Sequence, residues 1–181
     1  MKTIRNIMGL LAAGALLIAC NSTPSLQQYY VDNAGDPNFI SVDIPASILN
    51  VSEIDLTPEQ KSAYHSLRKF NVLAFKLTEE NKNEFEGEKE AVNAILKNDA
   101  YEELMRINTG SAKGVVKILG DEDSIDEVIL FGNDDSQGFA LIRVLGDDMR
   151  PENVMQLVEV IQKGNLDDSA LGPLKGFLDQ K

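Results

Sequence analysis

The chain has little of the chemistry on which most catalytic and metal-binding sites depend. It contains one cysteine and one histidine in 181 residues. A framework of disulfides is therefore excluded, and any Ser–His–Asp triad, Cys–His pair or histidine-bound metal would have to use His65. His65 falls beside the apolar stripe of the helix expected around it, a position that favours a solvated surface histidine.

The sequence also lacks a phosphate-binding loop and a dinucleotide-binding fingerprint. Its nearest glycine pair, Gly110 and Gly114, has neither the spacing of a phosphate loop nor the Lys-Ser/Thr pair that closes one. The net charge of −12 argues against binding nucleic acid or an anionic bilayer through the protein surface. These absences predict a non-enzymatic protein without a cofactor.

Residues 1–19 have the pattern of an export signal. Lys2 and Arg5 form a basic start, and the apolar core 7–18 is shorter than the roughly 20 residues that span a bilayer. The segment ends in Leu-Ile-Ala-Cys, which resembles the lipobox of bacterial lipoproteins. That resemblance implies cleavage before Cys20 and acylation of Cys20, and more than one acyl chain gives stable anchoring. The alternative is an ordinary secretory signal beside a free cysteine.

The residues after Cys20 narrow the expected location. Asn21 is not the Asp of the usual inner-membrane retention signal of enterobacteria, and residues 22–26 lack the acidic run that resembles a surface-export signal of Bacteroidetes lipoproteins. We therefore expect a lipoprotein of the outer membrane that faces the periplasm. In the tether 20–24, the four residues 21–24 reach at most about 14 Å, so a single domain over 25–181 should lie close to the bilayer.

Three short apolar runs near the middle of the chain predict an antiparallel meander. They cover 114–119, 125–131 and 139–145, and loops rich in Gly, Asp, Asn and Ser separate them. If each hairpin is centred on its loop, Lys117 faces Glu127 and Glu127 faces Arg143.

Side chains in these strands alternate between two faces of the predicted sheet. One face is almost wholly apolar and is expected to pack against helices: Val116, Ile118, Val128, Leu130, Ala140, Ile142 and Val144. The other face combines the charge row Lys117–Glu127–Arg143 with an apolar patch made of Ile129, Phe131, Phe139 and Leu141.

This apolar patch is the one positive signal for binding in the sequence. Four such side chains left in water would forgo roughly 6–12 kcal/mol, comparable with the ~5–15 kcal/mol that stabilises a whole domain. The patch should therefore be covered. The candidates are the N-terminal segment with Leu26, Tyr29 and Tyr30, the C-terminal tail, and a protein partner in the periplasm.

The remaining chain alternates helical and extended patterns. We expect an α+β fold with a mixed sheet of about five strands that ends in the three-stranded meander, and with helices mainly on one face. Strands are predicted at 39–44 and 71–77, and helices at 26–31, 57–69, 82–97, 101–107, after Pro151, and within 165–178. Thr57 and Gln60 predict a capping box at the start of the helix 57–69. The helix 82–97 has an apolar stripe made of Phe85, Val92, Ile95 and Leu96.

Several stretches resemble one family of uncharacterised proteins. They are the lipobox, the sequence Phe-Ile-Ser-Val-Asp-Ile-Pro at 39–45, the sequence Tyr-Glu-Glu-Leu-Met at 101–105, and the meander. Together they resemble Bacteroidetes lipoproteins catalogued as domain of unknown function 4252. The resemblance implies a lipoprotein with one domain. Its motifs are structural, so it implies no activity and no site.

Acidic loops are weak candidates for a calcium site. A meander brings the loop 120–124 and the turn 146–148 to the same end of the sheet, and calcium prefers oxygen ligands. The sequence is not an EF-hand loop, because Asp126 occupies its glycine position and Gly132 its final glutamate position. Solvated acidic turns are the competing interpretation of Asp121, Asp123, Asp147 and Asp148.

Two kinds of function remain open. The first is a non-enzymatic envelope lipoprotein that binds a protein partner or serves as an accessory module. The second is a carrier or sensor of a hydrophobic small molecule, or a weak calcium-binding module. A large cavity in the core would favour the carrier, whereas a solid core with an exposed apolar surface would favour partner binding.

Overall fold

The computed structural model describes residues 24–51, 55–110, 112–121 and 124–150, together with Val154, Gln156, Asn165 and Leu166. The expected export signal, the acylation site Cys20, and most of the chain after Arg150 lie outside the described residues. Predictions about those segments therefore stay predictions.

Six strands of the described chain form one sheet in which every neighbouring pair is antiparallel. The predicted three-stranded meander is confirmed as its β5–β6–β7 portion. The prediction of about five strands in a mixed sheet was wrong. The order is β1-β3-β7-β6-β5-β4, with β1 (Phe39–Pro45), β3 (Leu67–Lys76), β4 (Tyr101–Thr109), β5 (Ala112–Asp121), β6 (Ser124–Asp134) and β7 (Gly138–Met149).

The extra strand is β4, which occupies the stretch where a helix was predicted over 101–107. Its Glu-Glu-Leu-Met sequence consists of strong helix formers, but the chain pairs it with β5 instead. Gly110 makes the reversal into β5 with φ of +64°, a value that glycine adopts without strain. Pairing with a neighbouring strand therefore overrides the local propensity for helix.

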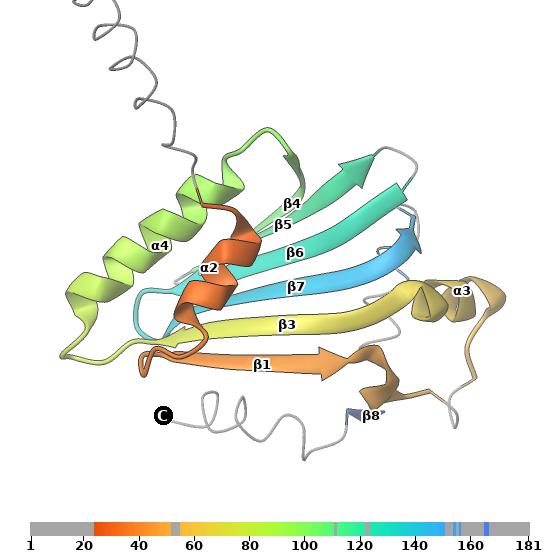
Figure 1. Ribbon diagram of the computed structural model, residues 1–181, viewed down its shortest axis with the longest axis horizontal. Coiled ribbons are helices and arrows are strands. Elements are labelled where there is room, and N and C mark those ends of the chain that lie inside the picture. Colours follow the sequence, from red (N-terminus) through yellow and green to blue (C-terminus); the bar gives the residue numbers. More distant parts are fainter. Residues whose placement is uncertain are drawn as a thin grey trace, which may run out of the picture.

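Helices α2 (Leu26–Asn33) and α4 (Lys82–Leu96) lie side by side across one face of the sheet (Figure 1). We call this the first face, and the opposite one the second face. The predicted apolar stripe of α4 is buried there: Phe85, Val92, Ile95 and Leu96. Helices do lie mainly on one face, but they cover the patch with the phenylalanines and not the face on which they were expected.

Helix α3 (Pro58–Ser66) lies at the other end of the sheet, beyond the start of β3 (Figure 1). It begins with the predicted capping box. The Thr57 hydroxyl accepts a hydrogen bond from the Gln60 amide, and the Gln60 side-chain carbonyl accepts one from the Thr57 amide, each at 3.2 Å.

The predicted faces of the meander are confirmed, but the predicted register was wrong by two residues at both hairpins. Val115 lies opposite Phe131, and Phe131 opposite Leu141. In the first hairpin, β6 contains a bulge at Asp126, and Gly120 has φ of +141°. A shift of two keeps each side chain on its predicted face, because faces alternate with period two.

After β1 the chain forms a short 3-10 turn, η2 (Ala46–Ile48), and a short strand, β2 (Leu49–Asn50). Strand β2 pairs with β8 (Asn165–Leu166), so the chain returns near its C-terminus to the end of β1 (Figure 1).

Candidate functional site

The apolar patch predicted as a partner site is buried inside the protein. Ile129, Phe131, Phe139 and Leu141 are exposed by 0%, 3%, 2% and 0%. They belong to one core cluster with Leu26, Tyr29 and Tyr30 of α2 and with the apolar stripe of α4. Internal cover by the N-terminal segment is therefore found, and these four residues offer no surface to a partner.

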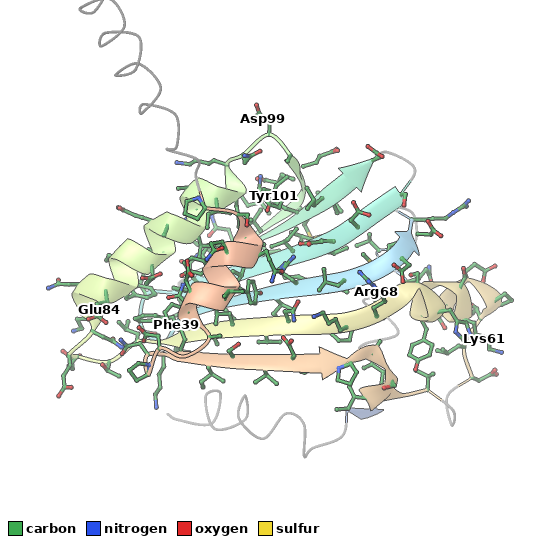
Figure 2. The ribbon with its side chains drawn as sticks, in the orientation of Figure 1. Phe39, Lys61, Arg68, Glu84, Asp99 and Tyr101 are labelled. Atoms are coloured by element: carbon green, nitrogen blue, oxygen red, sulfur yellow. The ribbon has the colours of Figure 1, made fainter. Side chains whose placement is uncertain are left out.

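Aromatic rings fill the space between the helices and the first face. The Phe75 and Phe139 rings stack with centroids 5.5 Å apart, and Phe39 meets Phe75 edge-on at 5.1 Å. Figure 2 shows Phe39 at the start of β1, beneath the end of α2. Phe131 and Phe85 also contact Phe139, at 5.7 and 6.2 Å. This part of the core is packed with rings that are nearly fully buried.

A buried ion pair lies beside the aromatic cluster on the first face. The Arg143 guanidinium donates to both carboxylate oxygens of Glu127, with a distance of 2.9 Å from Nε. Arg143 also donates to Gln27 of α2 at 2.6 Å and lies 5.4 Å from the centre of the Tyr30 ring. Its guanidinium therefore fixes α2 to the middle of the sheet.

The two tyrosines of α2 also fix the helix, through hydrogen bonds from their hydroxyl groups. The Tyr30 hydroxyl lies 2.7 Å from the Leu141 carbonyl oxygen, and the Tyr29 hydroxyl donates to Glu88 of α4 at 2.7 Å. Burial raises the pKa of both phenols well above the usual value, and the neighbouring Glu88 carboxylate raises that of Tyr29 further. Both hydroxyls therefore stay protonated and serve as donors that hold α2 in place.

The second face is apolar along three rows that run across the strands. The inner row, nearest α3, is buried: Ile44, Phe70, Val144, Val128 and Ile118. The middle row continues over all six strands: Val42, Val72, Ile142, Leu130, Val116 and Met105. The outer row lies farthest from α3: Ile40, Ala74, Ala140, Gly132, Gly114 and Ile107. The middle and outer rows contain no charged or polar side chain.

Exposure of the second face increases towards β4, whereas Val72 and Ala74 of β3 are buried. Ile142, Leu130 and Val116 are half-buried, whereas Met105 and Ile107 are exposed by 45% and 47%. An open pocket of about 340 Å³ lies at the β4 side of the outer row, lined by Ile107, Gly114, Gly132 and Ala140 among others. An apolar surface therefore remains open on the second face, on the side of the sheet formed by β4.

Strand β4 carries three of the four large hydrophobic side chains that are exposed in the described part of the chain. They are Leu104, Met105 and Ile107, and we call them the β4 surface; the fourth is Val31 of α2. Among the described strands, β4 is also an edge of the sheet, so one side of its backbone pairs with no described strand. Reasoning from the sequence missed this surface because it assigned these residues to a helix. The alternation of Met105 and Ile107 was the one signal for it.

The weak calcium candidates do not form a metal site in the described part of the chain. No group of three or more His, Cys, Asp or Glu side chains there is arranged to hold a metal ion. Asp147 instead contacts Arg68 at 3.3 Å, at the end of the sheet near α3 (Figure 2). Asp147 and Asp148 line one open pocket together with Asp126, whereas Asp121 is not among its lining residues and Asp123 lies outside the described residues.

The sole histidine lies on the surface of the protein. His65 is exposed on α3, and its ring contacts Tyr64 with centroids 5.6 Å apart. Among the described helices, none combines the length and the apolar character needed to cross a membrane.

Comparison with known proteins gives a family and no activity. A family model described as Domain of unknown function (DUF4252) matches residues 29–157. The chain belongs to this family. The match covers well over half of the chain, from α2 through all six strands of the large sheet. No protein in the curated set matches the chain significantly.

Proposed function

We propose that this member of the DUF4252 family is a non-enzymatic lipoprotein of the outer membrane that faces the periplasm and binds a protein partner. The lipobox ending at Cys20 supports the anchor. The single observation that supports partner binding is the open apolar end of the second face, which the β4 surface extends to the sheet edge.

A surface of this kind favours a protein partner for physical reasons. Contiguous apolar surface on a soluble protein commonly marks an interaction site, and an unpaired edge strand can accept a strand from another protein. The carrier alternative has less support. The space between α2, α4 and the first face is filled with aromatic rings, and the pocket on the second face is open to solvent.

The anchor is tested by mass spectrometry of the protein extracted from membranes. The mature protein should begin at Cys20 and carry the mass of a diacylglyceryl group and an N-acyl chain. A soluble form that begins at another residue, or a Cys20→Ala variant that still fractionates with the outer membrane, would contradict this part of the proposal.

Partner binding is tested by photo-crosslinking in intact envelopes. A photoreactive residue at position 107 should form a protein adduct, and the same residue at position 31 provides a matched control. Val31 is exposed by 61% and also apolar, but lies on α2 over the first face. The adduct at 107 should disappear in Met105→Glu. Equal adducts at both positions, or none at 107, would contradict the proposal.

A further inference from the structure

A second open pocket lies on the first face, between α4 and the β4 side of the sheet, with a volume of about 270 Å³. Two neighbouring rows across β4, β5 and β6 line it from the sheet: Arg106, Val115 and Phe131 form one row, and Asn108, Lys113 and Asn133 form the other. Lys89 and Asn93 line it from α4. These two residues are four apart, so they lie on the same side of the helix. The pairing of three strands and the packing of α4 therefore create the pocket together.

The lining of this pocket is basic although the protein is acidic. Among the described lining residues, Lys89, Arg106 and Lys113 carry a positive charge, whereas Asp135 alone carries a negative one. The whole chain has a net charge of −12. The pocket is therefore a local exception, and its charge favours an anionic ligand.

Two of the three cations are held in place by carboxylates and still keep N–H groups for a ligand. Lys89 Nζ donates to Glu86 at 2.9 Å and to Asp135 at 3.2 Å. Arg106 donates to Glu103 through Nε and Nη2. A guanidinium has donors on all three nitrogens, so Nη1 remains available. The Arg106–Glu103 pair is also exposed, and exposed ion pairs are weak enough for an incoming carboxylate to share the guanidinium.

Lys113 has the most capacity for a ligand. Among the described contacts, its ammonium group makes no ion pair and no hydrogen bond. Arg106 pairs with Val115, and Lys113 lies two residues before Val115 on β5. Arg106 and Lys113 are therefore diagonal neighbours, an arrangement in which long side chains reach each other. The two cations can converge on one carboxylate.

The rest of the lining supplies acceptors and an apolar floor. Asn93 and Asn133 each donate their amide nitrogen to a backbone carbonyl, at 2.8 and 3.4 Å, so their side-chain oxygens remain acceptors for hydroxyl groups. Val115 and Phe131 are exposed by 9% and 3% and offer apolar surface to the carbon skeleton of a ligand. Inorganic phosphate would use the cations but would leave these acceptors and this floor without a counterpart.

We propose that the pocket binds a small hydroxylated carboxylic acid, with its carboxylate on Arg106 and Lys113 and its hydroxyl groups on the asparagine oxygens. A guanidinium matches the geometry of a carboxylate. The volume is below the roughly 300–1,000 Å³ of sites for drug-sized ligands, so the ligand is a single small ring or chain. The site goes beyond the proposed function, because it lies on the face opposite Met105 and requires no protein partner.

The site is tested by titrating the full-length protein with glucuronate and following the backbone amides by nuclear magnetic resonance. Glucose, which lacks the carboxylate, and acetate, which lacks the hydroxyl groups, are the control ligands at the same ionic strength. Glucuronate should give saturable shifts at residues 106, 113 and 133, and each control ligand should bind several-fold more weakly.

Variants assign the binding to the pocket. Lys113→Ala should weaken glucuronate binding by about tenfold or more, because a hydrogen bond to a charged group is lost, and Lys113→Arg should restore most of it. Asn133→Ala should weaken the binding of glucuronate but not that of acetate. Lys61→Ala is the matched control and should change nothing, because Lys61 is an exposed lysine on α3, at the other end of the sheet (Figure 2).

Four outcomes overturn the inference. They are the absence of saturable shifts with glucuronate, equal affinities for glucose and glucuronate, displacement of glucuronate by inorganic phosphate at equal concentration, and equal losses of affinity in Lys113→Ala and Lys61→Ala. Unchanged thermal unfolding temperatures of the variants show that a loss of binding does not reflect a loss of folding.

Discussion

Glu127 and Arg143 form a buried ion pair although they do not face each other in the register of β6 and β7. Glu127 lies opposite Leu145, and Arg143 lies opposite Ile129, so the pair is diagonal. Their side chains are exposed by only 13% and 5%. The diagonal contact explains how a charge pairing predicted from a wrong register still occurs.

Removing one partner of this pair should destabilise the protein strongly. Arg143→Met leaves the Glu127 carboxylate buried without its counter-charge, and we expect unfolding free energy to fall by about 3–5 kcal/mol in urea titrations. The double variant Arg143→Met/Glu127→Leu should lose less than the single one. Arg106→Met is the control, because the Arg106–Glu103 pair is exposed and such pairs contribute about 0–1 kcal/mol. Equal losses of unfolding free energy in Arg143→Met and Arg106→Met would show that burial of the Glu127–Arg143 pair is unimportant.

The aromatic cluster should be essential for folding. Phe139→Ala removes a ring that is 2% exposed and contacts four other phenylalanine rings. The expected loss of unfolding free energy is about 3–5 kcal/mol. Met105→Ala should change it by less than about 0.5 kcal/mol because Met105 is exposed. A Phe139→Ala protein as stable as the parent would mean that the ring is not packed as described.

Alkaline pH should destabilise the protein through its buried tyrosines. Burial holds the pKa of the Tyr29 and Tyr30 phenols above the value of about 10 found in an unfolded chain. Below pH ~10 both states keep the protons, so stability does not depend on these groups. Above it the unfolded state releases protons that the folded state retains, so the free energy of unfolding falls as the pH rises.

This prediction is checked by following phenolate absorbance and circular dichroism together during a titration with base. Tyr29 and Tyr30 should ionise only as the protein unfolds, and Tyr30→Phe should weaken the dependence on pH. Ionisation of all four tyrosines before any loss of structure would contradict it.

Two glycines in the second hairpin should respond in opposite ways to alanine. Gly138 has φ of +125°, and a Cβ atom there would lie 2.0 Å from the Phe75 carbonyl oxygen. Gly138→Ala should therefore lower unfolding free energy by well over 1 kcal/mol, whereas Gly132→Ala should leave it unchanged or raise it by about 0.4–1 kcal/mol. Thermal unfolding of the two variants measures both changes. Similar changes of unfolding free energy in Gly138→Ala and Gly132→Ala would refute the difference in backbone geometry.

Reasoning from the sequence recovered the features set by local pattern. The capping box at Thr57, the apolar stripe of α4 and the two faces of the meander all depend on spacing along the chain, and the structure confirms each. The strand β4 was missed because Leu104 and Met105 favour a helix by propensity, and pairing with β5 is a tertiary preference that propensity does not report.

The candidate surface was placed on the wrong face for a related reason. Both faces of the meander are apolar in sequence, so periodicity shows that each face must be covered. It does not show which of the two faces α2 and α4 cover. The helices cover the face with the phenylalanines, where Tyr30 and Gln27 find hydrogen-bonding partners in the strands. The polar side chains of α2 therefore match groups on the face that the helix covers, and a pattern of apolar residues alone does not contain that information.

The strand order determines when the strands of the sheet can pair if the chain becomes available from its N-terminus onwards. Strand β3 pairs with β1 and β7, yet β4, β5 and β6 all precede β7 in the chain. Until β7 is available, β1 and β3 form a two-stranded ribbon, which is at best marginally stable in water. Closing the sheet is a late, long-range step that slows folding. A factor that binds residues 138–149 as the chain emerges would therefore prevent closure of the sheet, while one that binds β1 would leave the meander free to form.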